Sequence, residues 1–213
     1  MNVSAVYDAL TARYGDLHWW PAKTPYEVIV GAVLTQNTAW TNVEKAIANF
    51  GDKLSPQAVR DMSIAELIEI IRPAGFFNQK AAYLNAVTEW FARYNFDVEA
   101  VRHEPLEKLR PELLSVKGVG KETADSILLY AFGLPTFVVD AYTMRLCERF
   151  PIAAGKGYDA VKAHFEAGIA CDTKVYNNYH AMIVINAKEH CRKNKPLCGT
   201  CPLGDICERR GLH

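Results

Sequence analysis

The sequence predicts an all-α protein, and three observations support this class. Apolar residues recur at helical spacing in most segments, as at Ile64, Leu67 and Ile71. No segment shows a convincing strand pattern, and no low-complexity tract or obvious linker interrupts the chain. The 213 residues, 50% of them hydrophobic, suffice for one large domain or two small ones with a sizeable core.

The first half of the chain contains several helix signals. A helix is expected over residues 3–14, and a second helical pattern runs over residues 25–50, with four polar residues, 35–38, interrupting it. Ser55 and Pro56 then start another helix, because serine is a favoured N-cap and proline a favoured first residue.

The second half continues in the same way. Residues 72–81 end one helix and begin the next, whereas residues 95–112 are polar and are punctuated by Pro105 and Pro111. Further helices are expected within 113–132 and over 141–150, 158–169 and 175–190.

Composition narrows the function classes. No segment approaches eighteen uninterrupted apolar residues, so no membrane span is expected, and the N-terminus lacks a secretory pattern, which favours the cytoplasm. Lys and Arg number 24, and so do Asp and Glu. Bulk charge therefore does not support a nucleic-acid partner, and any basic face must be local.

One stretch, residues 113–124, carries a specific signal. An apolar helix end runs into Gly118-Val119-Gly120, and a new helix starts at once. Glycines allow close approach to the backbone, and the next helix adds unpaired N–H groups and the positive end of its dipole. These features together predict a site for a phosphate oxygen. An apolar run then leads to Asp140, which could cap the helix that follows.

Four of the six cysteines crowd the end of the chain, with the spacing C-x6-C-x2-C-x5-C. They are Cys191, Cys198, Cys201 and Cys207. Four thiolates on one compact loop can hold a [4Fe–4S] cluster, whereas structural zinc usually takes two separated C-x2-C pairs and this run has one. Cys147 and Cys171 are expected to be small buried side chains rather than ligands.

The stretch 113–124 resembles the helix-hairpin-helix of the endonuclease III superfamily of DNA glycosylases, in which an Asp also follows in a Val-Asp string. The cysteine spacing matches the cluster loop of endonuclease III, and the similarity extends over nearly the whole chain. The resemblance implies two helical lobes, with duplex DNA held across a cleft and the damaged nucleotide flipped into it. It also implies a [4Fe–4S] cofactor on the four cysteines.

The domains expected on this basis have the following bounds. A helical barrel spans 22–132 and ends in the helix-hairpin-helix at 113–132, and a terminal domain combines 1–21 with 133–213 and carries the iron–sulfur loop at 191–207.

The resemblance assigns catalysis to Asp140, which would stabilise an oxocarbenium-like sugar and orient or deprotonate a water. Members that also cut the backbone use a lysine on the second hairpin helix. Glu122 occupies that position here, and Lys121 lies one position before it, on a different side of the helix. Without this amine there is no Schiff-base nucleophile, so a monofunctional glycosylase is expected.

The substrate is expected to be an alkylated purine such as 3-methyladenine, because the chain looks most like that branch of the superfamily. Its pocket aromatics correspond to Trp19 or Trp20 and to Trp40. Stacked tryptophans favour a cationic base by about 2 kcal/mol when desolvated. That branch can lack the cluster, whereas this chain has all four cysteines.

The remaining expected contacts are to DNA. The residue at the helix tip would be Gln36 or Asn37, and the apolar wedge would be Phe76. The hairpin contacts would be Lys117, Gly118, Val119, Gly120, Lys121 and Thr123. A local excess of basic residues after Lys188 offers a second phosphate contact or offsets the charge of the cluster. The partner would be damaged duplex DNA, bound by a monomer, in the cytoplasm and at the nucleoid of a bacterium or archaeon.

Three other functions are compatible with parts of the sequence. A glycosylase for oxidised pyrimidines or mismatched bases is the nearest alternative, but it would need hydrogen-bonding groups where tryptophans stand. A non-catalytic helix-hairpin-helix DNA-binding protein would need neither Asp140 nor the aromatic residues. An iron–sulfur electron carrier would leave the hairpin unexplained.

Overall fold

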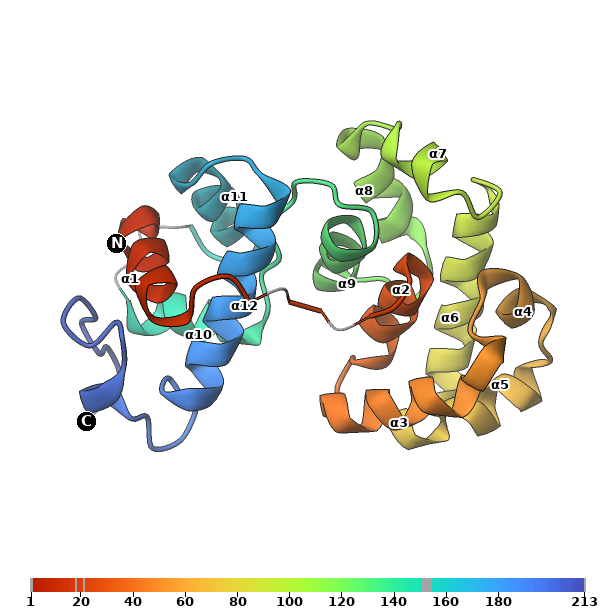
Figure 1. Ribbon diagram of the computed structural model, residues 1–213, viewed down its shortest axis with the longest axis horizontal. Helices are drawn as coiled ribbons and strands as arrows, with labels where there is room; N and C mark the ends of the chain where they lie inside the picture. Colours follow the sequence, from red (N-terminus) through yellow and green to blue (C-terminus); the bar gives the residue numbers. More distant parts are fainter. Residues whose placement is uncertain (1, 18, 21, 151–154, 213) are drawn as a thin grey trace. The chain divides into compact units, whose positions relative to one another are not determined.

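The computed structural model describes residues 2–17, 19–20, 22–150 and 155–212, and these residues form helices, turns and loops without a strand (Figure 1). The prediction of an all-α fold is confirmed. None of the helices within this part of the chain is long and apolar enough to cross a membrane.

The chain divides into two compact units, each described by itself below. Unit 1 comprises Met1–Trp19 and Pro135–His213, and unit 2 comprises Trp20–Leu134. The expected domains, 22–132 and the two terminal segments, stay a prediction about independently folding parts.

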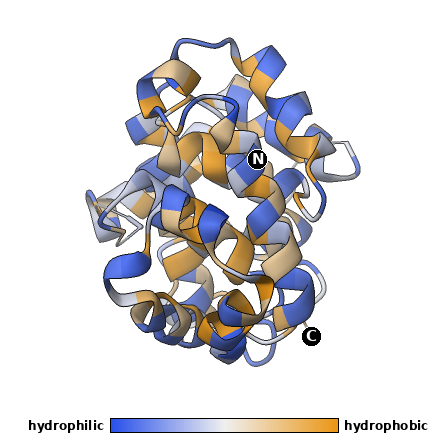
Figure 2. Cartoon of the chain, turned by 90° about the vertical axis from the view of Figure 1, so that its right-hand side faces the viewer, coloured by the Kyte–Doolittle hydropathy of each residue, from blue (hydrophilic) through white to orange (hydrophobic). Residues whose placement is uncertain are grey.

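Unit 2 is built around two buried helices, α2 and α6. Its elements are α2 (Pro25–Leu34), α3 (Trp40–Phe50), η1 (Gly51–Lys53), α4 (Pro56–Asp61), α5 (Ile64–Ile71), η2 (Arg72–Ala74), α6 (Phe77–Ala92), α7 (Val98–Arg102), α8 (Leu106–Ser115), α9 (Lys121–Ser126) and the π-helical turn η3 (Ile127–Ala131). Helix α2 starts where the Thr24 hydroxyl accepts from the Glu27 N–H, and eight of its ten residues are buried. The surrounding helices are amphipathic, with hydrophobic and hydrophilic residues alternating along them (Figure 2).

The polar stretch 95–112 contains two helices that its prolines did not suggest. Asp97 caps α7, and α8 carries Pro111 in its interior, which removes one backbone hydrogen bond. Leu109 and Leu113 lie on the buried face of α8. Burial of these two leucines outweighs the poor helix propensity of Pro111, as tertiary packing often does.

Unit 1 packs its long helix against α1 and α10. Its elements are α1 (Val3–Tyr14), α10 (Ala141–Arg149), α11 (Tyr158–Gly168), α12 (Thr173–Glu189) and the short turn η4 (Cys198–Thr200). Aromatic rings fill this core, and Phe137 stacks on Phe165 with their centroids 4.6 Å apart. Helix α12 begins two residues before its expected start, because the Asp172 carboxylate accepts from the Val175 N–H.

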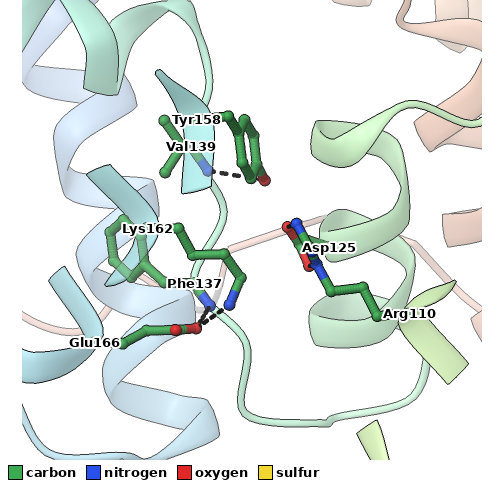
Figure 3. Close-up of polar contacts among 7 residues, drawn as sticks. All are labelled: Arg110, Asp125, Phe137, Val139, Tyr158, Lys162 and Glu166. Atoms are coloured by element: carbon green, nitrogen blue, oxygen red, sulfur yellow. Dashed lines mark hydrogen bonds and ion pairs between the residues drawn. The ribbon is translucent and has the colours of Figure 1, made fainter. Parts of the chain in front are cut away.

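Polar contacts tie the extended segment before α10 to its own unit (Figure 3). The Phe137 N–H donates to the Glu166 carboxylate at 2.9 Å, and Lys162 also pairs with this carboxylate. The Val139 N–H donates to the Tyr158 hydroxyl at 3.3 Å. This segment delivers Asp140 to the start of α10, and α11 anchors it.

Candidate active site and DNA-binding elements

Asp140 lies at the N-cap of α10 and is held by three groups of unit 1. Its Oδ1 accepts from the Thr143 N–H at 2.7 Å and from the Thr143 hydroxyl at 3.0 Å. Its Oδ2 lies 3.4 Å from Nε2 of His180, a buried residue of α12. The Asp140 side chain is 11% exposed, so the carboxylate is fixed in position yet retains some access.

The charge of Asp140 is set by opposing effects. Burial raises the pKa of its carboxyl group, but His180 and the two hydrogen bonds from Thr143 together bring the pKa below its usual range. The carboxylate is therefore ionised at neutral pH. An ionised, fixed carboxylate can stabilise a cationic transition state or act as a base.

The hairpin lies between α8 and α9 of unit 2. Its turn is closed by the Val119 N–H, which donates to the Val116 carbonyl at 3.1 Å. Gly118 has φ +84°, and a Cβ there would lie 2.1 Å from Cγ of Tyr83, so no other residue fits without movement. Gly120 differs, because a Cβ there would meet nothing within 4 Å and its φ is −89°. Its exposed backbone leaves space that a phosphate oxygen could use.

An ion pair locks the two hairpin helices together. Arg110 of α8 donates to both carboxylate oxygens of Asp125 of α9, at 2.8 and 3.1 Å (Figure 3). The Asp125 side chain is 0% exposed. The sequence analysis did not identify this pair, since nothing in the spacing shows that the two residues face each other.

The end of α2 is bonded to the hairpin through Gln36. Its Nε2 donates to the Gly118 carbonyl and to the Thr123 hydroxyl, both at 3.0 Å. Thr123 and Val119 are buried, whereas Lys117 and Lys121 are exposed. Of the expected hairpin contacts, Lys117, Lys121 and the backbone of Gly120 are therefore the groups that face solvent.

Asn37 and Phe76 stand at two exposed turns of unit 2. Asn37 has φ +53° and lies between α2 and α3. Phe76 has φ +47°, lies between η2 and α6, and is 63% exposed. Of the two residues expected at the helix tip, Asn37 has the exposed side chain and Gln36 is bonded internally.

Three aromatic rings of unit 2 gather over α2, and we call Trp20, Trp40 and Tyr130 the aromatic cluster. The Trp20 ring lies 5.6 Å from Trp40, edge to face, and 4.7 Å from Tyr130. Both tryptophans pack over Gly31, where a Cβ would come within 3.5 Å of each. Tyr130 belongs to the π-helical turn η3 and was not singled out in the sequence, although such turns are common at functional sites.

Trp19 is not part of the aromatic cluster. It belongs to unit 1, where its ring lies 5.9 Å from Nζ of Lys188. Of the two adjacent tryptophans, Trp20 is the one that belongs to the same unit as Trp40 and contacts it. The local conformation is unusual, since Trp20 has φ +75°.

Glu122 lies in the first turn of α9 and is exposed, next to the exposed Lys121. The carboxylate occupies the second helical position, where it interacts favourably with the dipole of the helix.

The four C-terminal cysteines have free thiols and share one environment in unit 1. Burial raises the pKa of Cys201 and Cys207, and the neighbouring Cys191 thiol raises both further. Two N–H groups donate to the sulfur atoms. Arg149 Nη1 lies 3.2 Å from Cys191 Sγ, and the backbone nitrogen of Arg209 lies 3.4 Å from Cys207 Sγ. Among the described residues, no three His, Cys, Asp or Glu side chains converge tightly enough for a single metal ion.

Arg149 of α10 organises this loop. Its guanidinium also donates to the carbonyls of Arg192 and Lys193, at 2.8 and 3.1 Å, and its own carbonyl accepts from the Arg210 N–H at 3.2 Å. This role of Arg149 is not evident from the sequence. The donors near the sulfur atoms and the wrapped loop, with Pro196 and Pro202, fit a group bound by thiolates.

The two other cysteines differ from expectation in one case. Cys147 is half-buried, and burial raises the pKa of its thiol to about 12. Cys171 is exposed, so the expectation that it is buried was wrong. It lies in the short connection between the C-cap of α11, Ile169, and the N-cap of α12, Asp172.

Comparison with known proteins decides the family. The model of the HhH-GPD superfamily of base excision DNA repair proteins matches residues 30–171, which include the hairpin and Asp140. The chain belongs to this superfamily. The resemblance to DNA glycosylases of the endonuclease III superfamily is thereby confirmed at the level of the family.

Relatives of the HhH-GPD superfamily extend the match beyond those residues. A candidate DNA repair glycosylase of Methanocaldococcus jannaschii is 46% identical over 95% of this chain and 94% of its own. Endonuclease III of Haemophilus influenzae is 31% identical, over 87% and 84% of the two chains.

Solved HhH-GPD structures share the fold. The 3-methyladenine DNA glycosylase of H. pylori, bound to 1,N6-ethenoadenine, has a TM-score of 0.78 and 28% identity, covering 89% of this chain and 98% of its own. An endonuclease III–DNA complex has a TM-score of 0.82 at 23% identity, covering 97% and 94%.

Proposed function

We propose that this HhH-GPD protein is a monofunctional DNA glycosylase that hydrolyses the N-glycosidic bond of a flipped alkylated purine, such as 3-methyladenine. The observation that carries this proposal is the aromatic cluster. Two tryptophans and a tyrosine in contact offer π-faces to a base, and they favour a cationic base by cation–π attraction. The likeness to the H. pylori 3-methyladenine glycosylase supports the same substrate class.

The indole N–H groups of the cluster are not available to a base. The indole Nε1 of Trp40 donates to Glu44 at 3.0 Å. The indole Nε1 of Trp20 is buried over Gly31 and has no hydrogen-bond partner within the part of the chain that the structure describes. A base would therefore contact the ring faces of the cluster and not these N–H groups.

Asp140 supplies the catalytic carboxylate in this proposal. An alkylated purine is cationic and leaves readily, so no general acid is required. The ionised Asp140 stabilises the developing positive charge on the sugar and orients or deprotonates the attacking water. Thr143 and His180 hold it for this task.

Glu122 supports hydrolysis without strand cleavage. A carboxylate cannot form a Schiff base with the sugar, and Lys121 occupies the preceding position of α9. The reaction therefore ends at the abasic site. The protein that binds the damaged duplex DNA is proposed to be a monomer.

The four cysteines are proposed to hold a [4Fe–4S] cluster. Cys191, Cys198, Cys201 and Cys207 would be its ligands, and Arg149 and the Arg209 N–H would donate to the ligating sulfur atoms. The group would cross-link the loop and fix its basic residues for phosphate contact.

The test is a single-turnover incubation with duplex DNA containing 3-methyladenine, quenched with and without hot alkali. Release of the free base, with strand breaks only after alkali, is expected. Breaks without alkali would contradict the monofunctional assignment. Absence of base release, together with excision of an oxidised pyrimidine or a mismatched base, would leave the family intact and overturn the substrate.

A further inference from the structure

A buried lysine in unit 2 joins two segments that the reaction would bring to the DNA. Lys80 of α6 is 2% exposed. Its Nζ donates to the Leu34 carbonyl and to the Ala74 carbonyl, each at 2.8 Å. Leu34 is the last residue of α2, and Ala74 is the last residue of η2.

Each of these carbonyls directly precedes one of the exposed turns. After Leu34 the chain turns through Thr35–Thr38, which includes Asn37, and after Ala74 it turns through Gly75 and Phe76. Asn37 and Phe76 both have positive φ, a conformation that is unfavourable for non-glycine residues and persists where surrounding contacts enforce it. The ammonium of Lys80 is the common contact at the base of both turns.

A charged ammonium group buried at Lys80 requires interactions that offset its lost solvation. Burial lowers the pKa of Lys80, because the charged form loses solvation. The Leu34 and Ala74 carbonyls accept hydrogen bonds from the ammonium group and so replace part of its lost solvation. The Leu34 carbonyl also lies at the C-terminus of α2, which is the negative end of the helix dipole. A methionine could fill a similar volume without that cost, but it could not bond to two backbone segments.

We propose that Lys80 is a positioning residue that holds the Asn37 turn and the Phe76 turn at a fixed separation, so that both side chains enter the duplex together when a nucleotide is flipped. Packing supports this rigid arrangement, since α2 contacts α6 and α3 contacts η2. The inference rests on the proposed base-flipping function, but not on which base is excised.

The first experiment compares Lys80→Met with Leu84→Ala, a substitution in the same helix at a residue that is 0% exposed. Leu84→Ala lowers stability without touching either turn, so it controls for a merely structural loss. Insertion is measured as the fluorescence rise of 2-aminopurine opposite a tetrahydrofuran abasic analogue. Excision is measured in single turnovers with the lesion either base-paired or opposite a gap in the partner strand.

Lys80→Met is expected to lose most of the fluorescence rise. It should slow excision of the paired lesion about tenfold, but by less than about threefold opposite a gap, where less unpairing energy is needed. Affinity for undamaged duplex should not change, because the hairpin is intact. Equal slowing on both substrates, as for Leu84→Ala, or an unaltered fluorescence rise would overturn the proposal.

A second measurement needs no Lys80 variant, in case Lys80→Met does not fold. The fluorescence rise is measured for Asn37→Ala, Phe76→Ala and the double variant. If the two turns insert together, the loss of fluorescence rise in the double variant should differ by more than about threefold from the product of the losses in the two single variants. Independent, multiplicative losses would refute a fixed arrangement. Since the abasic analogue contains no base to excise, failure of the 3-methyladenine assay would not affect the fluorescence measurements of either experiment.

Discussion

Asp140 combines a structural and a chemical property at the scale of a single residue. It caps α10 through Thr143, and the same contacts, with His180, keep its carboxylate ionised although it is largely buried. The capping role was visible in the sequence as an acid before a helical pattern. His180 was not, because it lies forty residues further along the chain, on α12, and reaches Asp140 through packing.

Asp140→Asn separates the two properties. Asparagine is as good an N-cap as aspartate, so the variant should fold, but it lacks the negative charge. Single-turnover excision should fall roughly a hundredfold or more, as expected for loss of a positioned base. Duplex affinity, measured in parallel, should stay close to that of the wild type. A variant that retains full excision activity would contradict the assignment of Asp140 as the catalytic carboxylate.

The same residue predicts an acid-dependent stability. The pKa of Asp140 is lower in the folded state than its unfolded value of about 3.9, so its contribution is fully present above that value and is lost as the pH falls through the folded pKa. The difference in unfolding free energy between the wild type and Asp140→Asn should therefore be constant above pH about 5 and shrink as the pH falls below about 4. Denaturant unfolding at several pH values measures it, and a difference independent of pH would contradict the assigned shift.

Glu122→Lys tests whether a missing amine limits the reaction to hydrolysis. A lysine at this exposed position of α9 would supply the nucleophile for a Schiff base. Strand breaks should then appear without alkali, and borohydride should trap a covalent protein–DNA adduct. Glu122→Gln, which removes the charge but adds no amine, is the control and should give neither product.

The two glycines of the helix-hairpin-helix have different roles. The sequence predicted that its glycines serve close backbone approach, and the structure divides this role between them. Gly118 is required inside the protein, by its positive φ and by the Tyr83 ring against it. No group among the described residues lies close enough to Gly120 to demand a glycine there, so its exposed backbone is suited to contact with a partner molecule.

The two glycines therefore predict different alanine variants. Gly118→Ala should destabilise the fold by about 1–3 kcal/mol or more, since strain and a clash with Tyr83 act together. Gly120→Ala should change stability by less than about 0.5 kcal/mol, yet weaken DNA binding, because its Cβ would stand where a phosphate approaches. Thermal unfolding and titration with duplex DNA measure the two effects. Equal effects of both variants on folding would contradict this division.

At the scale of the whole molecule, α10 connects Asp140, the proposed catalytic carboxylate, to the cysteine loop within unit 1. Asp140 stands at its start, and Arg149, at its end, donates to the loop. Arg145 adds a hydrogen bond of 2.8 Å to the Cys191 carbonyl. Loss of the proposed cluster should therefore loosen the loop and the end of α10.

Cys207→Ser tests this dependence, with the exposed Cys171→Ser as the control outside the loop. Iron and acid-labile sulfide should be lost in Cys207→Ser. Its melting temperature should fall, by roughly 2–4 °C for each kcal/mol lost in a chain of this size. Cys171→Ser should retain both metal content and stability. Loss of iron without a change in melting temperature would show that the group does not support this unit.

The sequence by itself determined the features that depend on local order. Helical periodicity, N-caps such as Ser55 and Asp140, the hairpin motif and the cysteine spacing are each contained in a few neighbouring residues, so the all-α fold and the family could be inferred from them. Local signals failed where packing opposed them, as in α8, whose buried leucines overcome Pro111.

Tertiary structure alone decided which distant groups meet. It joined Tyr130 to Trp20, Gln36 to the hairpin, Arg110 to Asp125 and Lys80 to two helix ends. It also left Cys171 exposed. The physical reason is that such contacts depend on which helix faces pack together. That choice is made by the whole core, and no spacing within one segment encodes it.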